Sequence, residues 1–139
     1  MVMKAMRQTL ALSAAALSLA LTGSAAMAQA VAQTPLAQPL QTSGSAVPNQ
    51  PSACGYLTAE ATQVLQVQED FVAVNITTSG STGLTLFITG PNGFSECHTT
   101  SDAAGTINAP GLLNQGRYSF YIGNANPGAT TYQLTISQD

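Results

Sequence analysis

The stretch "GLTLFITGPNG", residues 83–93, carries the pattern that decides the fold of this chain. Its apolar residues Leu84, Leu86 and Ile88 alternate with Thr85, Phe87 and Thr89. Because successive side chains of a strand point to opposite faces, this alternation predicts a strand with one buried face. Residues 90–93 then combine proline, asparagine and glycine, which favours a tight turn directly after the strand.

The same period of two recurs along the C-terminal part of the chain. It is present in residues 71–76, 118–122 and 131–136, and more weakly in 64–67, while no helical period is sustained. Turn-forming residues separate the runs, and two further breaks are expected in the Asn, Pro and Gly residues of 108–111 and 124–128. Short alternating strands at this spacing predict an all-β fold, an antiparallel β-sandwich of about 7–8 strands.

Three of these runs also resemble the bacterial pre-peptidase C-terminal domain. They are "GLTLFITGPNG" (83–93), "GRYSFYIG" (116–123) and "TTYQLTI" (130–136). That family typically has a D-L-D-L-Y-like strand, a G-P-x-G turn, a G-x-Y-x-x-x-V strand and a final Y-x-L-x-V strand. The opening "GYLTAEATQVLQVQ" (55–68) is similar to its first strands. The resemblance implies a jelly-roll-like sandwich, usually appended to secreted peptidases or other exported proteins.

The chain departs from that family at a place that matters for metal binding. Gly83 and Thr85 stand where the family pattern often has two aspartates. Relatives that bind calcium use clustered carboxylates, because Ca²⁺ takes six to eight oxygen ligands. The resemblance therefore implies no calcium site here, and we expect no metal and no other cofactor. The family's usual peptidase companion is missing as well.

The N-terminal residues predict export. Lys4 and Arg7 precede an apolar run over residues 10–21, and Ala26-Met27-Ala28 fits a small-x-small cleavage site, so residues 1–28 read as a signal peptide. Residues 29–51 are uncharged and rich in Gln, Pro and Ala, which predicts a disordered linker. Residues 52–139 are then predicted to form the sandwich domain, in a secreted or periplasmic protein.

The two cysteines of the chain, Cys54 and Cys97, both lie in that domain. Two cysteines in an exported chain most often pair, so a disulfide is predicted between them. Closing this loop restricts the unfolded chain by roughly 4 kcal/mol in the loop-entropy model.

Charge excludes two classes of partner. After signal cleavage Arg117 is the only basic residue against six carboxylates, so the formal charge is one minus six, or −5. A single cation cannot neutralise a phosphate backbone or hold the chain on an anionic membrane, so neither nucleic acid nor a membrane surface is expected as partner.

The densest group of reactive residues is Glu96, Cys97, His98 and Asp102. Adjacent residues of a strand point to opposite faces, which opposes proton transfer between Cys97 and His98, and a disulfide removes the nucleophile. Zinc needs three or four ligands, which His98, Glu96, Asp102 and the thiols could supply, but a disulfide removes the sulfurs, and Glu96 and His98 share a face only on a regular strand. No G-x-S-x-G elbow is present either. We therefore expect no catalytic residue, and interpret this group as solvated side chains beside a structural disulfide.

Aromatic residues suggest binding instead of catalysis. Phe87 and Tyr121 fall opposite the apolar faces of their predicted strands, where rings can stack on a sugar or anchor a protein. The alternative is that these rings simply cover edge strands, and the absence of tryptophan weakens the sugar interpretation. The sequence predicts a non-catalytic exported binding or accessory module with a protein or polysaccharide ligand. A carbohydrate-binding protein and a structural subunit of a surface assembly are the alternatives.

Overall fold

The computed structural model describes residues 31–100 and 105–139, so the predicted signal peptide 1–28 and Asp102 lie outside the described residues. The described chain is all-β, with one short 3₁₀ turn at Pro91–Gly93 and no helix long and apolar enough to cross a membrane. Its strands are β1 (Val31–Gln33), β2 (Leu40–Ala46), β3 (Gln50–Ser52), β4 (Gly55–Leu57), β5 (Gln63–Val67), β6 (Val72–Gly80), β7 (Leu84–Thr89), β8 (Ser95–Thr99), β9 (Thr106–Leu113), β10 (Gly116–Asn124) and β11 (Thr130–Gln138).

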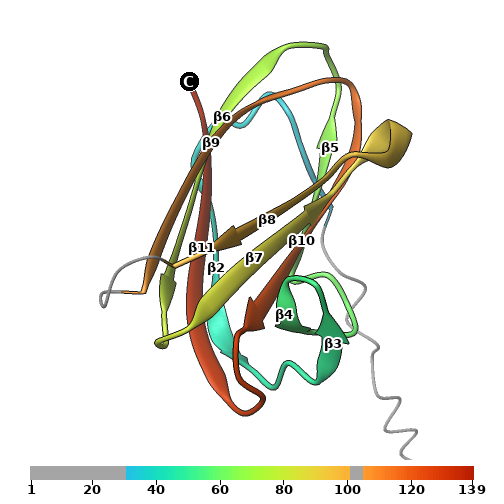
Figure 1. Ribbon diagram of the computed structural model, residues 1–139. Coiled ribbons are helices and arrows are strands. Elements are labelled where there is room, and N and C mark those ends of the chain that lie inside the picture. The colour runs from blue at the N-terminus through green and yellow to red at the C-terminus, as the bar shows by residue number, and fades with distance from the viewer. Residues whose placement is uncertain (1–30, 101–104) are drawn as a thin grey trace, which may run out of the picture.

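The strands form two sheets that pack face to face (Figure 1). One has four strands in the order β2-β11-β6-β9. In the other, of seven strands, β10 is central: it pairs with β5 and then β4 along one side and with β7 along the other, and β8 follows β7. The predicted two-layer sandwich is confirmed. The pairing is antiparallel as predicted, except between β1 and β5, which run parallel.

The alternation read from the sequence sets the inward faces of both sheets. Leu84, Leu86 and Ile88 of β7 are buried, and the corresponding residues of β6, β10 and β11 meet them in one continuous core. Phe94, just after the Pro91–Gly93 turn, packs edge-on against Tyr118 with ring centroids 5.5 Å apart. The core therefore joins both sheets. The residues of β7 and β10 that alternate with these buried residues are left on the outer face of the seven-stranded sheet.

The prediction of a disordered linker over residues 29–51 is wrong for the described part of that segment. β2 pairs with β11 along its whole length, from Leu40 opposite Ile136 to Ala46 opposite Thr130. Thr34 is buried, and its amide donates to the Gln66 carbonyl at 3.0 Å. The segment has few apolar residues of its own, but backbone hydrogen bonds to strands already packed on a core can order it. The sandwich thus begins near residue 31 instead of 52, and three strands add to the eight, β4–β11, that match the predicted number.

The predicted break at residues 108–111 is wrong as well. These residues lie inside β9, where Pro110 pairs opposite Asn75 of β6. Because β9 is the outermost strand of the four-stranded sheet, its other side needs no amide donor, and proline is tolerated there. The break predicted after residue 124 is confirmed, since β10 ends at Asn124 and β11 begins at Thr130.

Candidate ligand-binding site

Phe87 and Tyr121, the two predicted binding residues, are neighbours on the outer face of the seven-stranded sheet. They lie directly opposite each other in the register of β7 and β10. Their ring centroids are 6.2 Å apart and the ring planes are tilted by 42°. Both side chains are half-buried, whereas Leu86 and Ile122 beside them point into the core. The two rings therefore form an inclined pair that solvent can reach.

A short hairpin of β3 and β4, residues 50–57, forms the wall beside these rings. Pro51 pairs with Tyr56 across the hairpin, and Ser52 pairs with Gly55. At its turn the Ser52 hydroxyl donates to the Gly55 carbonyl at 2.6 Å and accepts from the Cys54 amide at 3.0 Å. Gly55 has φ +77°, a left-handed conformation that glycine adopts without strain, so the hairpin can close in two residues.

The hairpin approaches the sheet closely at Gly123 of β10. β4 pairs with the last two residues of β10, so that Leu57 lies opposite Gly123. A Cβ atom on Gly123 would lie 2.5 Å from both the Thr85 hydroxyl and the Tyr56 carbonyl oxygen. Glycine at this position is what lets the hairpin pack on the sheet.

Between the hairpin and the two rings lies an open pocket of about 380 Å³, which we call the aromatic pocket. Its lining contains two aromatic rings, three further apolar side chains and four uncharged polar side chains, and no Asp, Glu, His, Lys or Arg. The lining residues are Gln50, Pro51, Ser52, Leu57, Thr58, Ala59, Phe87, Thr89 and Tyr121. A pocket of this size that is mainly apolar, with a few hydrogen-bonding groups, is of the kind that holds small ligands.

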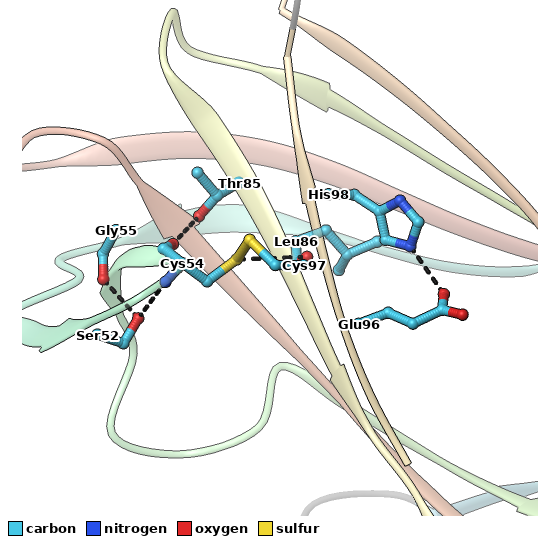
Figure 2. The surroundings of a disulfide bond; sticks show 8 residues. All are labelled: Ser52, Cys54, Gly55, Thr85, Leu86, Glu96, Cys97 and His98. Atoms are coloured by element: carbon cyan, nitrogen blue, oxygen red, sulfur yellow. Dashed lines mark hydrogen bonds and ion pairs between the residues drawn. A yellow bond between two sulfur atoms is a disulfide. The ribbon is translucent and has the colours of Figure 1, made fainter.

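A disulfide between Cys54 and Cys97 fastens the turn of the hairpin to β8 (Figure 2). The predicted pairing is therefore confirmed, with the two Cα atoms 5.6 Å apart. Thr85 of β7 adds a hydrogen bond from its hydroxyl to the Cys54 carbonyl at 2.9 Å. Cys54 is buried at the turn of the hairpin and Cys97 is exposed, so the bond runs from this turn to the edge of the sheet.

The group of reactive residues around Cys97 is divided between the two faces of β8. Cys97 lies opposite the outward Phe87, whereas His98 and Glu96 lie opposite the inward Leu86 and Ile88. His98 Nε2 lies 3.0 Å from a Glu96 carboxylate oxygen, in an exposed hydrogen bond (Figure 2). Within residues 31–100 and 105–139, no three His, Cys, Asp or Glu side chains gather as metal ligands would.

A buried phenol lies outside the pocket, on the inner face of β10. Burial raises the pKa of Tyr118 above its usual 10.0, and the negative charge of Asp70 acts in the same direction. Its hydroxyl donates to the Asn114 carbonyl at 3.1 Å. Asp70 itself accepts from the Gln115 amide at 2.8 Å, which ties the loop before β6 to the loop before β10. These contacts hold one end of the sandwich together and are structural.

The sequence located the rings but missed the rest of the pocket. Gln50 and Pro51 fall in the segment predicted as linker, and Leu57, Thr58 and Ala59 carry no distinctive motif. The one sequence feature that could have located these residues was Cys54. Its predicted disulfide to Cys97, on a strand, places the residues next to Cys54 close to the sheet that contains this strand.

Comparisons with known proteins concern the fold. No protein-family model matches the sequence, and no curated protein matches it. Among solved structures, the chain is similar to the periplasmic g-type lysozyme inhibitor PliG of Aeromonas hydrophila, with 12% identity, a TM-score of 0.48, and coverage of 78% of this chain and 96% of that one. PliG of Salmonella Typhimurium is similar at 15% identity and a TM-score of 0.46, over 78% of this chain and 98% of that one.

A further similar structure is the pre-peptidase C-terminal domain of collagenase from Bacillus anthracis. Here the identity is 13% and the TM-score 0.47, over 78% of this chain and 96% of that domain. The chain is thus similar in structure to a member of the family that its strand and turn motifs resemble.

Proposed function

We propose that this protein is an exported, non-catalytic binding module whose ligand occupies the aromatic pocket. The observation that carries the proposal is the pairing of Phe87 with Tyr121 at the base of a pocket of about 380 Å³. Half-buried aromatic rings on an outer sheet face offer a large apolar contact surface that is already held in place. Export is supported by the disulfide, which forms and persists in oxidising compartments.

The lining favours an uncharged ligand with both apolar and hydroxyl-bearing faces. The nine lining residues include no acid or base, so a charged ligand would lose its hydration without gaining a counter-ion. The amide of Gln50 and the hydroxyl of Thr89 offer donors and acceptors near the rings, and the Thr58 hydroxyl, which donates to the Glu60 carbonyl at 2.8 Å, offers an acceptor. A neutral sugar fits this combination, because one face of its ring is apolar and its edge carries hydroxyl groups. Carbohydrate binding is accordingly our choice among the ligand classes, with a protein partner as the competing outcome.

A non-catalytic role is supported by the state of the reactive side chains. Cys97 is joined to Cys54, so its sulfur is unavailable as a thiolate nucleophile. His98 is hydrogen-bonded to Glu96 on the opposite face of β8 from the aromatic pocket. A base on that face has no access to a ligand held by Phe87 and Tyr121.

Isothermal titration calorimetry with neutral oligosaccharides tests the proposal. The panel contains glucose-, galactose- and N-acetylglucosamine-based oligosaccharides, and a sulfated oligosaccharide serves as the charged control. We expect one neutral class to bind and the Tyr121→Ala and Phe87→Ala variants to weaken it about tenfold or more. The matched control is Phe71→Ala, because Phe71 is an exposed ring outside the pocket and its loss should leave affinity unchanged. The proposal fails if no neutral sugar binds, or if Phe71→Ala weakens binding as much as Tyr121→Ala.

A further inference from the structure

We infer that the aromatic pocket is redox-dependent: the Cys54–Cys97 disulfide holds the β3–β4 hairpin in place as its wall, and reduction releases the hairpin without unfolding the sandwich. The inference rests on the proposed function in assuming that the pocket holds a ligand. The release of the hairpin does not depend on that assumption and can be tested without a ligand.

Most of the pocket wall belongs to one short segment. Six of the nine lining residues lie between Gln50 and Ala59, and the remaining three are on β7 and β10. A two-stranded hairpin with three residues in each strand is not stable alone, so it depends on its attachments to the sheet. Movement of this one segment would remove two thirds of the lining while leaving the rings on their strands.

The strand pairing that attaches the hairpin to the sheet lies on its β4 side. β4 pairs with only two residues of β10, and the Thr58 amide donates to the Ile122 carbonyl at 3.2 Å. Leu57 is buried against the sheet. On the side of β7 and β8, the described attachments of the turn are the disulfide, the Thr85 hydrogen bond to the Cys54 carbonyl, and a contact of 3.8 Å between the Cys54 sulfur and the Leu86 carbonyl oxygen. Breaking the disulfide therefore leaves that side of the hairpin with the Thr85 hydrogen bond and the weak contact of the Cys54 sulfur with the Leu86 carbonyl.

The core of the sandwich is not built from these attachments. The continuous core that joins the two sheets is built from other residues and includes neither cysteine nor Leu57. The four-stranded sheet, with β2, β6, β9 and β11, makes no strand pair with the hairpin. Loss of the disulfide is thus expected to open the hairpin locally, as a unit of lower stability than the core.

The disulfide can be reached from solvent at one of its ends. Cys97 is exposed on an edge strand, whereas Cys54 is 3% exposed at the turn of the hairpin. A dithiol reductant would attack the bond from the Cys97 side, and a mixed disulfide would form first. In the complete step the Cys54–Cys97 bond breaks, both cysteines become thiols, and the dithiol gives up two electrons and two protons as it closes to its own disulfide.

Hydrogen exchange and calorimetry on the same samples test the inference. The samples are the oxidised protein, the protein treated with dithiothreitol, and the Cys54→Ser/Cys97→Ser double variant. We expect the Thr58 amide and the hairpin amides to exchange about tenfold faster or more once the bond is broken, while β6 and β11 keep their protection. The matched control is the double variant, whose exchange should not respond to dithiothreitol.

Ligand binding gives the second readout. A neutral oligosaccharide that binds the oxidised protein should bind the reduced protein and the double variant about tenfold more weakly or worse. If no oligosaccharide binds the oxidised protein, the proposed function fails, and hydrogen exchange alone still decides whether the hairpin is released. Unchanged hairpin exchange on reduction, equal ligand affinity in both states, or loss of protection throughout β6 and β11 would each overturn the inference.

Discussion

Cys97 lies directly opposite Phe87 in the register of β8 and β7. The residue that fastens the hairpin is therefore the strand neighbour of a ring that forms the base of the aromatic pocket. A segment that looks like a reactive cluster in the sequence is, in the fold, the attachment point of the hairpin that lines the aromatic pocket. The close fit of hairpin to sheet leads to the first of the predictions below.

Gly123→Ala should displace the hairpin. The added Cβ would lie 2.5 Å from the Tyr56 carbonyl oxygen, a backbone atom that cannot turn aside. We expect the free energy of unfolding in urea to fall by about 1–3 kcal/mol, as in other overpacked sites. Gly111→Ala is the control, because a Cβ there meets its nearest neighbours at 4.0 Å, and a change within about 0.5 kcal/mol is expected. Equal effects of the two variants would contradict the close approach at Gly123.

Thr78→Val should stabilise the protein. The Thr78 hydroxyl is fully buried and has no hydrogen-bond partner within residues 31–100 and 105–139, so a methyl group of similar shape avoids its desolvation cost. We expect a gain of about 1 kcal/mol in the free energy of unfolding.

Thr85→Val is the matched comparison, and we expect it to lower the free energy of unfolding instead of raising it. Thr85 is also buried, but its hydroxyl donates to the Cys54 carbonyl at 2.9 Å. Its loss should cost about 1–3 kcal/mol, because the carbonyl is left without that donor. The same sign for both valine variants in chemical denaturation would refute this assignment.

Phe71 stands in a backbone conformation that suits glycine better. Its φ is +60° and 72% of the residue is exposed, so the ring gains little burial in return for the strain. Phe71→Gly should therefore be more stable than Phe71→Ala by about 1 kcal/mol, since alanine keeps the Cβ that clashes. Thermal unfolding of the two variants measures the difference. A less stable glycine variant would show that the left-handed conformation at residue 71 costs nothing.

Tyr118 should produce a loss of stability at alkaline pH. Burial raises the folded-state pKa of its phenol above the usual 10.0, so the unfolded chain releases this proton first. Stability contributed by the neutral phenol is thus fully present below pH 10 and falls as the pH rises through the folded-state pKa. Urea titrations between about pH 9 and 11 should show a smaller decline in Tyr118→Phe than in the parent. Identical slopes would mean that Tyr118 titrates alike in both states.

The strands that face the core were predictable from the sequence because burial imposes a period of two on their side chains. Leu84, Leu86 and Ile88 illustrate this, and the residues between them were correctly placed on the outer face. β2 was missed because it contributes little to the core and is held by backbone hydrogen bonds to β11, which leave no side-chain pattern. Phe87 and Tyr121 could be singled out from the sequence because they are large residues on the strand faces that point away from the core. The β3–β4 hairpin could not be placed from the sequence, because its position depends on the Cys54–Cys97 link and on Gly123.

The most direct test of the central claim is an amide chemical-shift titration of the oxidised, isotope-labelled protein with the neutral oligosaccharide panel. The account predicts saturable shifts that centre on Phe87, Tyr121 and residues 50–59, with the four-stranded sheet unaffected, and their disappearance in Tyr121→Ala. Shifts centred on any other surface, or saturable shifts that persist in both Tyr121→Ala and Phe87→Ala, would contradict the claim that the aromatic pocket is the binding site.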